Sequence, residues 1–327
     1  MSGSSCRRGP PRASEAKRHE AEAKLRTLEI GLVLPMGESF VDGSTARWIE
    51  IRELAVRAEE LGFDSVWVAD ELLWRSPSGP TQGWWECVAM AGAVAAATSR
   101  IKIGTWVLSA LHRNPGVTAR AVETIDEISG GRFVLGIGSG HAGGQARAFG
   151  LPEDRVFGRF AEAVEIIVPL LRDGRADFEG TFHAARALEH RPVGPRPGRI
   201  PIMMGAKGPK MLQLTVRHAD IWSWYVEERS DLAEFGPRLD ALEAACRDAG
   251  RDPSSIGRSA GIVVEPTSVT GAAEALAVPV RGSPEEIATA LRAFGDRGFT
   301  QLELILWPPT LTALEALGPV LELMESN

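Results

Sequence analysis

Residues 101–140 contain a buried strand, a helix and a second buried strand in direct succession. The run 101–108 is short, apolar and rich in β-branched residues, which is typical of a strand covered on both faces. An Asn-Pro pair at 114–115 begins a helix, and a Gly-Gly pair at 130–131 ends it. The apolar strand 132–136 follows. Because strands joined through a helix run parallel, the sequence predicts an α/β fold with a parallel sheet.

The same alternation of strand and helix recurs along the rest of the chain. Strands are expected at 28–34, 63–69, 101–108, 132–136, 201–204, 219–224, 258–264 and 301–306. Helices are expected at 45–61, 83–98, 115–129, 155–172, 209–216, 232–249, 284–294 and 310–324. Eight such units predict a closed (β/α)8 TIM barrel. The alternative is an open doubly wound sheet, which at this width would leave long exposed edges.

Three segments depart from this pattern. Residues 177–199 contain three prolines and are predicted to form an inserted loop or hairpin after the fourth unit. Residues 265–281 are too irregular to assign. Residues 1–26 are polar and mixed in charge, so we expect a disordered tail. The barrel domain is then expected to span 27–327.

Composition excludes several classes of function. The net charge of −7 gives no basic surface for nucleic acid. No apolar stretch reaches the length of a membrane-spanning helix. The three cysteines, Cys6, Cys87 and Cys246, lack the spacing of a disulfide framework or a zinc site, which favours a reduced, cytoplasmic compartment.

The site of such a barrel lies at the carboxyl ends of its strands. In this chain those ends carry Pro35, Met36, Asp70, Glu71, Trp106, Val107, Ser139, Gly140, His141, the run from Gly205 to Gly208, the run from Trp222 to Tyr225, Glu265 and Trp307. The set is mostly apolar and aromatic, and it lacks both the clustered ligands of a metal site and a nucleophile elbow. It suits a planar, partly anionic cofactor that brings its own reactivity.

The stretch from Gly138 to Gly143 also matches the pattern G-x-G-x-x-G after a strand. As evidence for a nicotinamide dinucleotide this match is weak. The next long helix begins near Arg155 rather than at the glycines, and no acidic strand end follows at the expected distance.

Several longer stretches resemble the luciferase-like monooxygenase family, in its branch of oxidoreductases that depend on the deazaflavin coenzyme F420. The matching text includes GFDSVWVAD at 62–70, HRNPGVTARAVETIDEISGGRFVLGIGSG at 112–140 and PIMMGAKGPKMLQL at 201–214. The resemblance covers residues 28 to about 225 well and the remainder loosely. Its motifs are specific to the family, but they distinguish much less well between its F420-dependent and FMN-dependent members.

The resemblance implies a deazaflavin or flavin across the strand ends, with its ring over the third strand. A non-proline cis peptide in that strand would fall at Trp106–Val107. Contacts to the ring and its surroundings are expected from Met36, Asp70, Gly138, Ser139, Gly140 and His141. Contacts to the phosphate side are expected from Gly205, Ala206, Lys207 and Gly208, since amides at a helix start and one cation favour an anion.

The acid and base of the reaction are less clearly marked. Asp70, Glu71 and Trp74 match an Asp-His…Trp cluster of the family, with Glu71 in place of the histidine. His141 falls roughly where the family has a glutamate. We therefore expect Asp70, Glu71 and His141 as catalytic candidates, with Asp70 better suited to holding the loop or a ring edge than to acting as a base. Trp74, Trp106 and Trp224 are expected to line an apolar substrate cavity.

The leading hypothesis is an F420-dependent oxidoreductase that transfers a hydride to or from a small organic substrate. The second is an FMN-dependent two-component monooxygenase that takes reduced flavin from a separate reductase. The third is a non-catalytic flavin-binding barrel, which the departures at the acid and base positions support weakly. The resemblance also implies a homodimer.

Overall fold

The computed structural model describes residues 28–39, 43–75, 80–267 and 277–325. The predicted tail at 1–26 lies outside the described residues, as does part of the unassigned segment 265–281.

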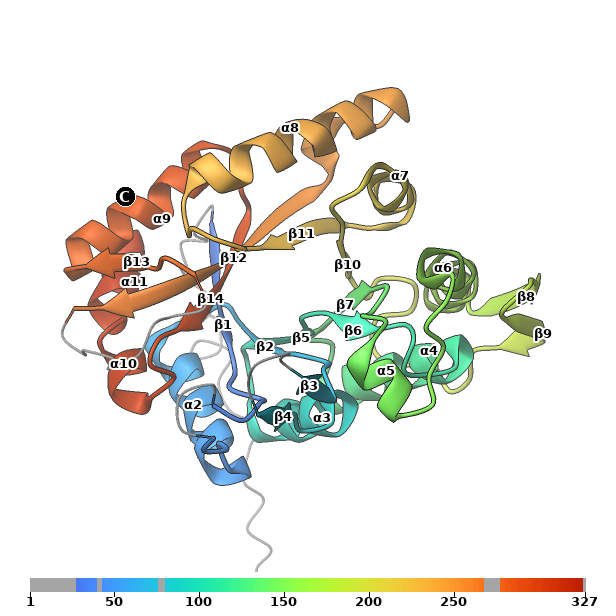
Figure 1. Ribbon diagram of the computed structural model, residues 1–327, viewed down its shortest axis with the longest axis horizontal. Helices are drawn as coiled ribbons and strands as arrows, with labels where there is room; N and C mark the ends of the chain where they lie inside the picture. Colours follow the sequence, from blue (N-terminus) through green and yellow to red (C-terminus); the bar gives the residue numbers. More distant parts are fainter. Residues whose placement is uncertain (1–27, 40–42, 76–79, 268–276, 326–327) are drawn as a thin grey trace, which may run out of the picture.

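Eight parallel strands close into a barrel ringed by helices (Figure 1). In hydrogen-bonded order these strands are β1 (Glu29–Val33), β2 (Ser65–Val68), β5 (Lys102–Thr105), β7 (Phe133–Gly138), β10 (Ile202–Gly205), β11 (Ile221–Tyr225), β12 (Gly257–Pro266) and β14 (Gln301–Leu306). The last strand pairs with the first, in a register that joins Glu29 to Gln301. Each of the eight therefore has two parallel neighbours, which confirms the (β/α)8 barrel and excludes the open sheet.

The helices of the ring follow their strands in sequence order. They are α2 (Trp48–Leu61), α3 (Cys87–Ala97), α4 (Pro115–Ser129), α6 (Val156–Asp173), α7 (Pro209–His218), α8 (Leu232–Asp248), α9 (Pro284–Asp296), α10 (Leu311–Glu315) and α11 (Gly318–Glu325). The short elements α5 (Gly144–Ala148), a 3-10 turn (Pro253–Ser255) and β13 (Val280–Gly282) were not predicted.

Two predicted helices are wrong in extent. The helix expected at 83–98 begins at Cys87, because β4 (Thr81–Gly83) pairs with β3 (Leu73–Arg75) in a hairpin and Glu86 caps the first helical turn. The helix expected at 310–324 is divided into α10 and α11. Pro319 has no amide hydrogen, which suits the first turn of α11, where backbone amides have no partner within the helix.

The third strand is also interrupted, as the family resemblance implied. Strand β5 ends at Thr105, a cis peptide joins Trp106 to Val107, and the short strand β6 (Leu108–Ser109) then pairs with β7. The inserted segment forms an antiparallel hairpin of β8 (Arg175–Glu179) and β9 (Ala184–Glu189), which confirms the hairpin alternative. It starts slightly earlier than predicted because Gly174, with φ of 73°, ends α6 abruptly.

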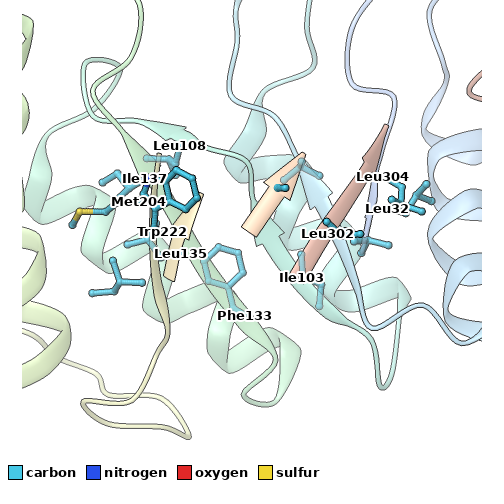
Figure 2. Packing of buried hydrophobic residues seen from close by; sticks show 14 of the residues in the cluster. Leu32, Ile103, Leu108, Phe133, Leu135, Ile137, Met204, Trp222, Leu302 and Leu304 are labelled. Carbon is cyan, nitrogen blue, oxygen red and sulfur yellow. The ribbon is translucent and has the colours of Figure 1, made fainter. Parts of the chain in front are cut away.

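The main hydrophobic core lies between the barrel and the helices. Figure 2 shows outward-facing residues of adjacent strands, such as Leu32, Leu302 and Leu304, gathered in this layer. A separate buried cluster of Trp67, Val134 and Met203 fills the barrel itself. A Cβ at Gly104 would lie 1.9 Å from the Trp67 ring, so β5 passes the indole only because this position is glycine. Among the helices of the described residues, none is long and apolar enough to cross a membrane.

A carboxyl group is buried inside the barrel as well. The Glu303 side chain on β14 is completely enclosed and hydrogen-bonds to Ser259 and Gln301. Burial, only partly offset by these hydrogen bonds, raises the pKa of Glu303 from its ordinary value of 4.5 to about 7.

We expect Glu303→Gln to stabilise the protein above pH 7 and to leave its stability unchanged near pH 4. Because the pKa of Glu303 is higher in the folded than in the unfolded chain, folding loses stability as pH rises from the unfolded value toward 7. The amide, which does not ionise, should recover about 3 kcal/mol at pH 8. Denaturant unfolding at both pH values measures this, with the exposed Glu127→Gln as control. Equal or lower stability of Glu303→Gln at pH 8 would contradict the assignment.

Candidate functional site

A cavity of about 1090 Å³ opens at the carboxyl ends of the barrel strands. Small-molecule sites commonly occupy roughly 300–1,000 Å³, so this cavity can hold a cofactor-sized ligand together with a smaller molecule. Of the residues predicted from sequence, its described lining includes Met36, Asp70, Glu71, Trp74, Trp106, Val107, Gly138, Ser139, Gly140, His141, Gly205 and Trp224. It does not include Ala206, Lys207 or Gly208.

The cis peptide between Trp106 and Val107 forms part of the cavity wall. The Trp106 ring fits against β12, where a Cβ at Gly261 would lie 2.1 Å from the ring. Below it, the Thr105 hydroxyl donates a hydrogen bond of 2.7 Å to the carbonyl of Gly136. The bulge is thus fixed to the neighbouring strand β7 and, across the barrel, to β12.

The glycine-rich end of β7 lines the same wall with bare backbone. A Cβ at Gly138 would lie 2.8 Å from Val107, and a Cβ at Gly140, whose φ is 77°, would lie 2.1 Å from Ser109 Oγ. The Ser109 side chain is buried, and its hydroxyl has no hydrogen-bond partner among the described residues. A ligand that lies here can therefore approach the backbone closely.

Asp70 is committed to protein contacts. Its fully buried carboxylate accepts hydrogen bonds from the Arg113 guanidinium at 2.6 and 3.0 Å and from the Ser109 amide at 2.8 Å. His112 Nδ1 lies 3.3 Å away. Burial opposes ionisation of Asp70, but its contacts with His112 and the hydrogen-bonded, positively charged Arg113 outweigh burial and hold the pKa of Asp70 below its usual range. This arrangement supports the holding role that the sequence favoured over a role as base.

Glu71 and His141 meet across the cavity mouth. His141 Nδ1 lies 2.9 Å from Glu71 Oε1, and the other carboxylate oxygen accepts a hydrogen bond from Gln145. Gln145 is fixed in turn, because its Oε1 accepts from the Leu72 amide at 3.0 Å. The hydrogen bond to Glu71 raises the pKa of His141 above its ordinary 6.5. The pair can hold and exchange a proton at neutral pH.

The phosphate-side residues predicted from sequence lie beside the cavity rather than in it. The Ala206 carbonyl accepts a hydrogen bond from the Trp222 indole, and Lys207 pairs with Glu227 at 2.9 Å. Gly208 is the N-cap of α7. Only Gly205 of this run reaches the described lining.

The aromatic residues form one face of the cavity. Trp224 stacks on Tyr225 with ring centroids 5.2 Å apart, and the Arg238 guanidinium covers the other side of the indole at 4.7 Å. Tyr225 also meets the edge of Trp106. Trp74 is about half exposed, at 46%, on the β3–β4 hairpin. Met36 is buried beneath the cavity.

Sequence reasoning missed several lining residues. Gln145 lies on α5, a helix too short to show periodicity, and only its proximity to the glycine-rich stretch marks it. Glu50 and Glu53 lie on α2, where they look like ordinary solvent-facing residues. In the part of the chain that the structure describes, no group of three or more His, Cys, Asp or Glu is placed to hold a metal ion.

Comparison with known proteins gives consistent matches. The chain is 33% identical over 205 residues to 5,10-methylenetetrahydromethanopterin reductase of Archaeoglobus fulgidus. The match covers 63% of this chain and 57% of that protein. It is 30% identical over 307 residues to F420-dependent glucose-6-phosphate dehydrogenase of Kineococcus radiotolerans. This match covers 81% of this chain and 87% of that protein. The chain spans 51–61% of the length of the Archaeoglobus fulgidus protein and of two further F420-dependent glucose-6-phosphate dehydrogenases.

A solved structure shares the fold. An F420-dependent secondary alcohol dehydrogenase in complex with an F420–acetone adduct superposes with a TM-score of 0.73 at 18% identity, over 90% of this chain and 98% of the other. The family model described as luciferase-like monooxygenase matches residues 28–281, most of the barrel. The chain therefore belongs to the luciferase-like monooxygenase family.

Proposed function

We propose that this protein is an oxidoreductase that uses coenzyme F420 and transfers a hydride between the deazaflavin and a small organic substrate. The observation that carries the proposal is the cavity built over the Trp106–Val107 cis peptide and the glycine-rich end of β7. The named F420 dependence of a relative that matches 81% of the chain supports the choice of cofactor.

The residues present fit such a cofactor. A flat ring needs close backbone approach, and side chains at Gly138 and Gly140 would collide with Val107 and Ser109. The buried Ser109 hydroxyl offers a polar group that no described residue satisfies. When bound, the deazaflavin supplies a two-electron hydride donor or acceptor.

The roles of the chain follow from where its groups lie. Trp106 and Val107 would support the ring, and Gly138, Ser139 and Gly140 would contact it through the backbone. The run from Gly205 to Gly208, at the start of α7, would face the anionic part of the cofactor, and Lys207 would exchange its contact with Glu227 for that anion. Glu71 and His141 would hold and move the proton of the substrate.

The second candidate is an FMN-dependent monooxygenase supplied with reduced flavin by a separate reductase. The description of the matching family model favours it, because that description names monooxygenases. The same cavity and the same bare backbone would accept a flavin ring.

Turnover without oxygen tests the proposal against this candidate. Deazaflavin absorbance is followed under anaerobic conditions, with alcohols supplied to oxidised F420, which accepts the hydride, and aldehydes and unsaturated ketones supplied to reduced F420, which donates it. The proposal expects an absorbance change with at least one of them. Product that forms only with oxygen and reduced FMN would instead identify the monooxygenase. No turnover in either assay would favour the third hypothesis, a non-catalytic flavin-binding barrel.

We also propose a cytoplasmic homodimer. Trp48 and Ile49 at the start of α2 are 39% and 63% exposed, and Trp85 lies next to them because its indole donates to the Ala46 carbonyl at 2.9 Å. This apolar surface near α2 and α3 would be covered by a second copy. Light scattering coupled to size exclusion should give twice the chain mass, and a monomer at micromolar concentration would contradict the proposal.

A further inference from the structure

We infer that the end of the cavity beside α2 binds an apolar or aromatic substrate that carries a positively charged group, and that it excludes phosphorylated and carboxylated substrates. The inference rests on the proposed function, since it concerns the substrate end of the same cavity.

The cavity has two ends that different elements build. One end is lined by the glycine-rich end of β7, by Gly205 and by Trp224. The other is lined by the loop after β1, the first turns of α2 and residues 307–311 after β14. Helices α2 and α7 lie on opposite sides of the ring of helices (Figure 1). A cofactor whose anionic part lies toward α7 leaves the α2 end for the substrate.

The charges along the described lining have one sign. It contains the carboxylates of Glu38, Glu50, Glu53, Asp70 and Glu71, and no lysine or arginine. Arg75, on the nearby hairpin, is not part of that lining. The two segments nearest in sequence, 40–42 and 76–79, contain no lysine or arginine either.

Two of these five carboxylates face a basic side chain, and three do not. Asp70 is paired with Arg113, and Glu71 faces His141. Glu38, Glu50 and Glu53, all at the α2 end, form no ion pair with any residue that the structure describes. A negative potential therefore remains at that end alone, where it favours cations and opposes anions.

The helix start at this end is not available to an anion. The amide groups at the beginning of a helix commonly bind phosphate. Here the Glu50 carboxylate accepts a hydrogen bond of 2.7 Å from the Arg47 amide, so the protein's own anion occupies this position. Glu38 likewise accepts from the Gly83 amide at 2.6 Å. A phosphate at this end would meet three carboxylates and no lysine or arginine along the described lining; Arg47, at the start of α2, lies outside that lining.

The walls of this end accept an apolar body. Trp84, Trp307, Pro308 and Leu311 line it together with Met36. Aromatic faces attract cations as well as apolar groups, so they reinforce the preference that the carboxylates set. Hydrophobic walls and unpaired carboxylates together select an amine with an apolar or aromatic framework.

Three probes of one shape test this inference: 1-naphthylmethylamine, 1-naphthylmethanol and 1-naphthylmethyl phosphate. Their dissociation constants for the full chain are measured by isothermal titration calorimetry, with no cofactor added. We expect the amine to bind about tenfold or more tighter than the phosphate, with the alcohol between them, and the difference to shrink in 0.5 M salt. Equal or tighter binding of the phosphate would overturn the inference.

Variants locate the effect. Glu50→Gln/Glu53→Gln should weaken amine binding about threefold to tenfold and strengthen phosphate binding, whereas the exposed Glu127→Gln on α4 should change neither. An unchanged amine–phosphate ratio in the double variant would overturn the assignment to the α2 end. F420 binding, measured separately, keeps the two proposals distinct: F420 binding without charge discrimination refutes only the substrate class, and discrimination without F420 binding refutes only the cofactor.

Discussion

Replacing Asp70 with alanine is expected to lower the free energy of unfolding by about 3 kcal/mol, because it removes the buried carboxylate of the pair and leaves the Arg113 guanidinium only the half-exposed Glu86 as a partner. The Ser109 amide loses its acceptor at the same time, and this amide begins the segment after the cis bulge. Denaturant unfolding at pH 7 measures the change.

The control is Asp240→Ala, which removes an exposed ion pair with Arg297 and should cost no more than about 1 kcal/mol. Because the pKa of Asp70 is lower in the folded than in the unfolded chain, its contribution is complete above the unfolded value near 3.8 and is lost as pH falls through the folded value. The difference between wild type and Asp70→Ala should therefore shrink in acid. Equal costs for the two variants at pH 7 would contradict the account of Asp70.

Replacing His141 with glutamine is expected to lower kcat for hydride transfer about 10²–10⁴-fold, which is the usual contribution of a positioned acid or base. The glutamine keeps a hydrogen-bonding group beside Glu71, but its amide neither gains nor loses a proton near neutral pH. Steady-state rates with the first substrate found in the anaerobic assay measure the effect. His183→Gln, on the inserted hairpin, is the matched control and should be silent.

Glu71→Gln tests the pair through its pH dependence. Glu71 raises the pKa of His141, so protonated His141 persists to higher pH in the wild type. If protonated His141 is the acid, activity falls as pH rises through that raised value, and Glu71→Gln should move this fall toward pH 6.5. A pH profile that does not move would remove His141 and Glu71 from the proton transfer.

The repeating units of the fold were readable from sequence because buried parallel strands and amphipathic helices have different periods. Features that depend on single contacts could not be predicted from sequence in this way. The β3–β4 hairpin displaces the start of α3, yet its strands are only three residues long. The break before α11 falls at Gly318 and Pro319, inside the periodic pattern 310–324.

The candidate site divides in the same way. Strand ends are fixed by the barrel, so Trp106, Gly138 and Glu71 were found from sequence. Gln145 and the carboxylates of α2 reach the cavity only through the packing of loops and helix starts, which no local pattern encodes. At Lys207 the sequence did not show the local partner: a lysine at a helix start suggests an anion site, and here the side chain also pairs with Glu227 beside the cavity.

The central claim is that the cavity is built for F420, and equilibrium binding tests it most directly. Purified protein is titrated with F420 and with FMN side by side, and binding is followed by fluorescence quenching. The account predicts micromolar or tighter binding of F420, with FMN about tenfold weaker or more, a difference of at least 1.4 kcal/mol. Tighter binding of FMN than of F420 would contradict this claim and favour the FMN-dependent monooxygenase instead.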